Sequence, residues 1–139
     1  MSRIFWDTNL FVYLLEGGPL SQRVAELRKA MLARGDQLLT STLTLGEVLV
    51  KPLEKADEAL SRRYEEAIAA GSLMLPFDAK AARIYAVLRR DRSLRPPDAI
   101  QLACAASVRV DLFITNDGHL QSKHVEGIHF IVPLERAPL

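Results

Sequence analysis

The chain has 139 residues, of which 49% are hydrophobic and 25% are charged, and this composition is typical of a globular protein rather than a disordered or fibrous one. We treat residues 1–139 as one domain, because two independent cores in a chain of this length would each be small. The 18 basic and 17 acidic residues leave a net charge of +1. This balance excludes a polybasic protein that holds nucleic acid by bulk charge, so such a partner must bind a local patch.

A single cysteine, Cys104, rules out an intramolecular disulfide framework and a cysteine-rich zinc site. The longest stretch without a charged residue, 67–77, is far shorter than the roughly 20 apolar residues of a membrane helix. The residues before the first apolar run are too few for a signal peptide. We therefore expect a soluble, cytoplasmic domain with no membrane partner.

Short apolar runs alternate with helical patterns along the chain. In chain order we expect strand 4–6, helix 10–15, helix 22–34, strand 37–40, helix 42–50, helix 57–70, strand 73–77, helix 79–90, helix 98–107, strand 112–115 and strand 128–132. Ser21 and Asp78 are expected to cap helices and Gly35 to end one. Pro52 is expected to close a helix, because proline has no N–H for the helical ladder. The alternation predicts an α/β fold around a mostly parallel five-stranded sheet.

Four acidic residues are expected at one edge of that sheet. Asp7 directly follows the first strand, and Asp117 lies at the end of the fourth, after Asn116. Asp98 opens a helix, and Glu47 lies about one turn into a helix that follows a strand. The carboxyl ends of parallel strands and the N-termini of the following helices share one edge, where ligands usually bind. Asp111 precedes its strand and therefore falls on the opposite edge.

Each of these four acids also has a purely structural explanation. Asp7 and Asp98 can cap helices, Asp117 can form an Asx turn, and Glu47 can pair with Lys51 one turn later. Together, however, four carboxylates at one edge repel one another unless a cation neutralises them. A hard, oxygen-seeking ion such as Mg²⁺ or Mn²⁺ fits an all-carboxylate site.

Four short motifs resemble those of the PIN domain: DTN at 7–9 after an apolar strand, TLGEVL at 44–49, PDAIQLA at 97–103 and TND at 115–117. Their order and spacing are similar to those of the VapC-type toxins of bacterial and archaeal toxin–antitoxin modules. The likeness runs from Ile4 to Val132, and the four motifs in register make it specific.

The resemblance implies a three-layer α/β/α Rossmann-like fold and a Mg²⁺- or Mn²⁺-dependent endoribonuclease that acts as the toxin of a type II, VapBC-like module. It also implies a cognate antitoxin protein that inhibits the enzyme. The acidic centre that it implies consists of Asp7, Glu47, Asp98 and Asp117. The polar residues that it implies as support are Thr8, Asn9, Thr115 and Asn116.

Hydrolysis of a phosphodiester needs an activated water, a neutralised phosphate and a stabilised leaving oxygen, which divalent ions can supply. We expect Asp7 and Asp98 to bind the principal ion, with Asp117 beside them. Glu47 either binds a second ion or orients the attacking water.

Local basic residues are expected to hold the RNA substrate. Six basic side chains and one acid in the segment 80–95 give it a local charge of +5. Arg92 and Arg95 are the favoured phosphate contacts, because they lie in the loop that leads to Asp98. The alternative is that the arginines of this segment only complement a helix C-terminus and stay solvated.

Three other functions suit the same fold. A phosphoacceptor receiver domain needs paired acids after the first strand and a lysine after the fifth, whereas this chain has only Asp7 and no such lysine. A phosphatase of the DxDxT type needs an acid where Asn9 stands. A non-catalytic PIN-like module that only binds proteins stays open, although the four intact acids argue against it.

We also expect a homodimer that a partner peptide holds in check. More apolar side chains lie near the acidic residues than the sheet and its helices obviously bury: Leu10, Val12, Leu14, Leu15, Leu45 and Leu49. Leftover apolar patches usually mark interfaces, and an amphipathic inhibitor helix there would direct an arginine towards the carboxylates. The alternative is that these side chains complete the core of a monomer.

Overall fold

The computed structural model describes residues 1–139 and contains one five-stranded sheet with six α-helices. The elements are β1 (Arg3–Trp6), α1 (Thr8–Glu16), α2 (Ser21–Arg34), β2 (Gln37–Ser41), α3 (Thr42–Glu54), α4 (Glu58–Gly71), β3 (Leu73–Leu75), α5 (Ala79–Leu88), α6 (Pro96–Val108), β4 (Val110–Ile114), β5 (Ile128–Val132) and a final 3-10 turn, η1 (Leu134–Arg136). The strand order is β3-β2-β1-β4-β5, and all four neighbouring pairs are parallel. The prediction of an α/β fold with a mostly parallel five-stranded sheet is therefore confirmed.

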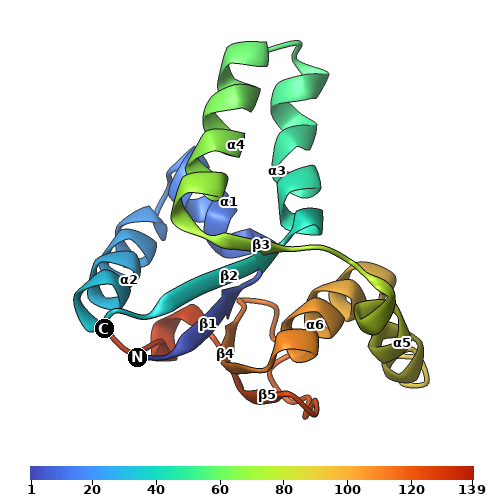
Figure 1. Cartoon of the computed structure of the whole chain (residues 1–139). Coiled ribbons are helices and arrows are strands. Elements are labelled where there is room, and N and C mark those ends of the chain that lie inside the picture. Colours follow the sequence, from blue (N-terminus) through green and yellow to red (C-terminus); the bar gives the residue numbers. More distant parts are fainter.

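Helices cover both faces of the sheet, which produces three layers (Figure 1). The central strand β1 shows how the sequence specifies them, because successive side chains of a strand point to opposite faces. Phe5 packs into a core beneath α5 and α6, while Ile4 and Trp6 pack into a second core with α1, α2 and α4. The helices α3 and α4 pack against each other and stand away from the sheet as a pair (Figure 1).

The strand order creates a crevice beside the central strand. From β1 the chain proceeds to β2 and β3 on one side, and then returns to place β4 and β5 on the other side. Crossovers therefore leave β1 in opposite directions, and a crevice opens outside the carboxyl ends of β1 and β4 at this switch point. Asp7 follows β1 and Thr115 follows β4, so both lie at this crevice.

Two predicted helix boundaries are wrong. Ser21 is the first residue of α2 and not its cap; Leu20 occupies the cap position and makes no side-chain hydrogen bond there. Pro52 lies inside α3, which continues to Glu54. Proline is tolerated there because it removes only one backbone donor near the helix end, and the Pro52 carbonyl still accepts a hydrogen bond from Asp57 N at 2.8 Å.

Several other elements differ from their predicted length. The strand β3 ends at Leu75 and not at residue 77, because Pro76 has no N–H to extend the ladder. The helix α5 ends at Leu88 and not at residue 90, and the next residues form a turn. The helix α6 begins at Pro96, two residues earlier than predicted, since proline suits the first turn of a helix.

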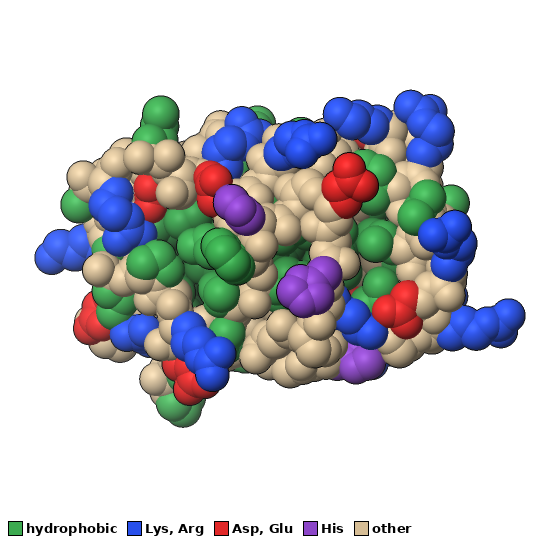
Figure 2. Space-filling view, turned by 90° about the horizontal axis from the view of Figure 1, so that it is seen from below, with side chains coloured by type: hydrophobic (Ala, Val, Ile, Leu, Met, Phe, Trp, Pro, Cys, Tyr) green, Lys and Arg blue, Asp and Glu red, His purple; other side chains and the backbone are tan.

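Charges of both signs are interspersed on the face seen from below, where basic side chains lie mostly along the rim (Figure 2). This agrees with the net charge of +1.

None of the helices combines the length and the hydropathy that a bilayer-spanning segment requires.

Candidate active site

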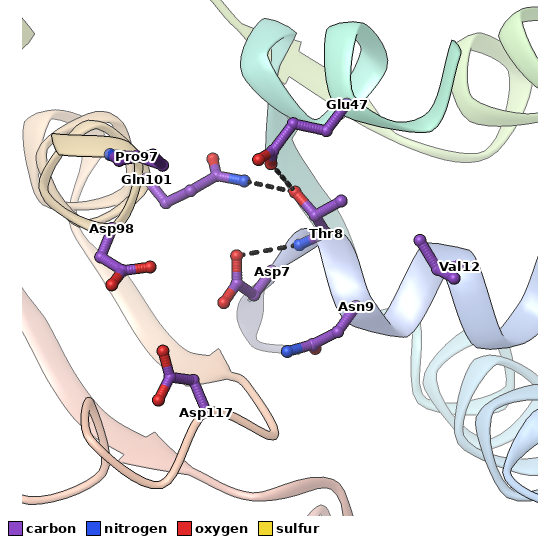
Figure 3. A pocket seen from close by; sticks show the side chains of 9 residues that line it. All are labelled: Asp7, Thr8, Asn9, Val12, Glu47, Pro97, Asp98, Gln101 and Asp117. Carbon is purple, nitrogen blue, oxygen red and sulfur yellow. Dashed lines mark hydrogen bonds between the residues drawn. The ribbon is translucent and has the colours of Figure 1, made fainter. Parts of the chain in front are cut away.

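The four acids that the sequence placed at one edge lie around a single cavity of about 300 Å³. It opens at the carboxyl edge of the sheet, and its lining residues come from α1, α3, α6 and the loops after β1 and β4 (Figure 3). The lining residues are Asp7, Thr8, Asn9, Val12, Glu47, Pro97, Asp98, Gln101 and Asp117. Asp111 lies at the other end of β4, where its Oδ2 accepts a hydrogen bond from Arg3 N at 2.7 Å.

Asp7 is the most deeply buried of the four acids, with 8% of its surface exposed. Its Oδ1 accepts a hydrogen bond from Thr8 N at 2.9 Å and caps α1, and its Oδ2 accepts one from Thr115 Oγ1 at 2.7 Å. Burial raises the pKa of Asp7 to about 6; these two hydrogen bonds oppose the rise, and the nearby charges of Asp98 and Glu47 add to it. Asp7 therefore caps α1, as predicted. Its carboxyl group also lies at the cavity, where ionisation costs free energy because the group is buried.

Asp98 does not cap its helix. Arg95 holds the cap position of α6, and Asp98 lies in the first turn, where its Oδ2 is buried without a hydrogen-bond partner. Burial and the neighbouring charge of Asp117 raise the pKa of Asp98, while Arg95 lowers it. This oxygen has an ion pair with Arg95 at 3.5 Å, but a buried carboxylate oxygen without a hydrogen bond is still costly.

Asp117 combines a turn role with a place in the cavity. Its Oδ1 accepts a hydrogen bond from His119 N at 3.0 Å, as the Asx-turn explanation predicted. Its Oδ2 lies 3.6 Å from Arg95 Nη2, and Arg95 Nε lies 3.5 Å from Asp98 Oδ2. Arg95 thus lies across both carboxylates with 75% of its side chain exposed, whereas Arg92 is exposed and makes no hydrogen bond or ion pair.

Glu47 enters the cavity from the second turn of α3 and is exposed. Thr8 Oγ1 donates a hydrogen bond to Glu47 Oε1 at 2.5 Å. The alternative pairing of Glu47 with Lys51 does not form, because Lys51 Nζ contacts Glu16 Oε1 at 3.1 Å instead.

The asparagines of the two motifs connect the loops around the cavity. Asn116 N donates to Asn9 Oδ1 at 3.4 Å, and Asn116 Oδ1 accepts from Leu134 N at 3.0 Å. Asn9 lines the cavity, whereas Asn116 does not and instead attaches the loop after β4 to η1. These contacts connect the loop after β4 to α1 and to η1.

Gln101 is a cavity residue that the sequence analysis did not select. It is buried, with 2% of its surface exposed, and hydrogen bonds to Thr8, Thr44 and Ser41. The pattern contained a clue, since Gln101 is the only polar residue in the run 99–106 and lies three residues after Asp98, on the same helical face.

The donor set fits a hard divalent cation, because all the charged groups that line the cavity are carboxylates. Asp98 Oδ2 is buried without a hydrogen bond, and the pKa of Asp7 is raised; a bound cation would stabilise both carboxylates. No three Asp, Glu, His or Cys side chains converge on one point as they lie here. A cation held by three of these carboxylates would therefore require them to move closer together. At Asp98 and Asp117 it would meet the guanidinium of Arg95, 3.5 Å and 3.6 Å from their Oδ2 atoms.

The PIN domain family profile matches residues 4–125 of the chain. No curated protein matches it by sequence.

Solved structures of low sequence identity share the fold. One is VapBC2 from Rickettsia felis bound to a DNA fragment from its promoter, with 15% identity, a TM-score of 0.76 and coverage of 94% of this chain and 98% of that chain. DNA-bound VapBC from Salmonella typhimurium has 20% identity, a TM-score of 0.76 and coverage of 96% and 99%. VapBC-5 of the VapBC family of toxin–antitoxin systems, from Mycobacterium tuberculosis, has 22% identity, a TM-score of 0.65 and coverage of 96% and 99%.

Proposed function

The chain belongs to the PIN domain family, and we propose that it is a divalent-metal-dependent endoribonuclease. PIN domains are in general nucleases. The observation that carries the proposal is the convergence of Asp7, Glu47, Asp98 and Asp117, from different elements, on one cavity.

The roles follow from burial and hydrogen bonding. Asp7 and Asp98 would hold the principal Mg²⁺ or Mn²⁺ ion, with Asp117 beside them, since Asp7 is held by two hydrogen bonds and Asp98 has a buried oxygen without one. The bound ion supplies charge neutralisation of the phosphate and lowers the pKa of a coordinated water. Glu47 has one oxygen bonded to Thr8 and no hydrogen bond at the other, so it is suited to orient the attacking water or to bind a second ion.

We propose RNA as the substrate, held partly by Arg92 and Arg95. Arg95 already lies at the mouth of the cavity, and displacement by a cation would free its guanidinium for a phosphate. Arg92 lies in the same loop, is exposed and makes no ion pair.

In the cell, we propose, the chain is the cytoplasmic toxin of a VapBC-like module with a cognate antitoxin. Its likeness to VapBC structures over more than nine-tenths of the chain supports this role.

The homodimer remains a proposal, but the exposed apolar residues that would support it differ from those that the sequence suggested. Leu10 is buried, and the other five residues of that set are half-buried against the core, whereas Val50 and Leu53 on α3 are 50% and 56% exposed.

The direct test is cleavage by the purified protein, freed of any coexpressed antitoxin. We expect cleavage of RNA with Mg²⁺ or Mn²⁺, none with excess EDTA, and none by Asp98→Asn. Unchanged cutting in EDTA would refute the metal mechanism. RNA binding without cleavage under any divalent ion would support the non-catalytic alternative.

Light scattering tests the assembly. We expect a dimer at micromolar concentration and a larger complex after coexpression with the neighbouring gene product. A monomer that binds no such product would contradict both the dimer and the toxin role, and would leave the nuclease proposal standing.

A further inference from the structure

A buried network of polar side chains lies beneath the acidic cavity. It joins α1, the end of β2, α3 and α6 through Thr8, Thr40, Ser41, Thr44 and Gln101. Gln101 is its centre, because it contacts three of the other four residues from the opposite side of the crevice. A buried amide is tolerated in the apolar run of α6 only because its polar atoms are bonded.

The partners of Gln101 determine the orientation of its amide. Ser41 Oγ accepts a hydrogen bond from Leu43 N at 3.2 Å and donates its proton to Gln101 Oε1. The amide nitrogen therefore faces the other way and donates to Thr8 Oγ1 at 3.0 Å and to Thr44 Oγ1 at 2.8 Å. Both amide protons are used. A flipped amide would place its oxygen against two hydroxyls whose single protons go to Glu47 and Thr40, so the oxygen would find no donor there.

The hydroxyl protons are assigned in the same way, because each hydroxyl has only one proton. The main-chain oxygen of Trp6 only accepts, so Thr40 donates to it at 3.0 Å, and Thr44 must be the donor in its 2.8 Å contact with Thr40. The carboxylate of Glu47 also only accepts, so the single proton of Thr8 points to Glu47 Oε1 at 2.5 Å. The 3.2 Å contact between Thr8 and Thr44 Oγ1 carries no proton in this arrangement.

We propose that Gln101 is a positioning residue for Glu47 and acts through Thr8. Glu47 is exposed, and its only hydrogen bond is the one from Thr8. A long exposed side chain is ordered only where a specific contact offsets the entropy of its rotamers. The Gln101 amide donates to Thr8 Oγ1 and thereby leaves the Thr8 proton for Glu47.

Without the amide donor, the Thr8 hydroxyl is free to turn towards Thr44, 3.2 Å away, and Glu47 loses its anchor. The catalytic part of this inference rests on the proposed nuclease function, whereas the link from Gln101 to Glu47 does not.

The link itself is tested in the metal-free protein by urea unfolding. The variants are Gln101→Met, Glu47→Ala and the double variant, each in the parent and in a Thr8→Val background. We expect the shifts of the urea midpoint to be non-additive in the parent, although the two side chains form no hydrogen bond with each other, and additive once Thr8 is valine. Additive shifts in both backgrounds would overturn the inference.

The effect on catalysis is tested by the kinetics of RNA cleavage. Gln101→Met is expected to lower kcat by about tenfold or more and to leave KM within about twofold, since it disturbs an orienting group and not the RNA contacts. Gln101→Glu keeps the size of the side chain but replaces the donor by an acceptor, so it should show the same loss. Ile100→Ala is the control, because this neighbour on α6 packs against the core and has no bond to the network.

An equal loss in Ile100→Ala, or a Gln101→Glu variant with parental kcat, would overturn the positioning role. Absence of cleavage by the parent protein would refute the proposed function instead, and the urea experiment would then decide the inference alone.

Discussion

Thr115 Oγ1 donates a hydrogen bond to Asp7 Oδ2 at 2.7 Å, and this contact joins the carboxyl ends of the neighbouring strands β1 and β4. Thr8 N holds the other oxygen of Asp7 at 2.9 Å. The first acid of the cavity is therefore immobilised by the sheet itself. Its burial still outweighs both hydrogen bonds, because the pKa of Asp7 is raised to about 6.

Replacing Asp7 by Asn is expected to stabilise the metal-free protein and to abolish cleavage. The pKa of Asp7 is higher in the folded than in the unfolded chain, so ionisation of this carboxyl lowers the free energy of unfolding. This loss of stability is absent below pH 3.8, grows between pH 3.8 and about 6, and is constant above about pH 6. Asparagine does not titrate and still caps α1, so Asp7→Asn should gain up to about 3 kcal/mol at pH 8 and almost nothing near pH 4.

Urea unfolding at pH 4, 6 and 8 in EDTA measures this difference. Asp111→Asn, at the opposite end of β4, is the control, because it removes a carboxylate that lies outside the cavity. A lower stability of Asp7→Asn at pH 8 would mean that the Asp7 carboxylate is chiefly structural.

Metal affinity is expected to depend on pH through the same residue. An ion requires the ionised carboxylate, and with a pKa of about 6 only a quarter or so of Asp7 is ionised at pH 5.5. Calorimetric titration with Mn²⁺ should therefore show affinity about fourfold weaker at pH 5.5 than at pH 8. Equal affinity at the two pH values would exclude Asp7 from the principal metal site.

Arg95 and Arg92 are expected to behave differently. Arg95→Gln removes the cation that lies across Asp98 and Asp117, so Mn²⁺ should bind several-fold more tightly, whereas Arg92→Gln should leave the affinity unchanged. Both variants should bind RNA more weakly. Each lost phosphate contact should also reduce the slope of log K against log salt by about 0.7 for single-stranded RNA.

Filter binding of a non-cleavable RNA at several salt concentrations measures the slope. If both variants keep the slope of the parent protein, neither arginine contacts an RNA phosphate. Unchanged Mn²⁺ affinity in Arg95→Gln would show that the guanidinium does not compete with the metal.

The sequence predicted the acids that follow strand ends, Asp7 and Asp117, and those in the first two turns of helices, Asp98 and Glu47. An apolar run followed at once by Asp7, or by Thr115 and Asp117, places these residues at the carboxyl edge of a parallel sheet, whatever the exact strand lengths. The contacts of Arg95 and Gln101 depend on how α6 is rotated against β2 and α1. Packing of many side chains determines that rotation, and spacing along the chain does not encode it.

The boundary errors have a similar origin. Proline and serine have strong average preferences, but tertiary context overrides them. Pro52 is buried and lies two residues before the end of α3, so its missing N–H removes only one hydrogen bond near the end of the helix. Ser21 makes no cap because the turn before it places Leu20 at the cap position.

Gly127 is expected to be the least replaceable glycine of the fold. Its φ is +95°, a region that disfavours side chains, and an added Cβ would lie 2.7 Å from the carbonyl oxygen of Ala106. The contacted atom belongs to the backbone of α6, so a side-chain rotation cannot relieve the overlap. Gly127→Ala should cost about 3 kcal/mol or more in the free energy of unfolding, through strain and overlap together.

Gly46→Ala is the matched control: nothing lies within 4 Å of its added Cβ, and α3 should gain about 1 kcal/mol from the better helix former. Because Gly127 precedes β5, at the sheet edge opposite the acids, Gly127→Ala should lower the urea midpoint yet leave the Mn²⁺ affinity of the folded protein unchanged. A parental urea midpoint for Gly127→Ala would contradict the close approach of this loop to α6.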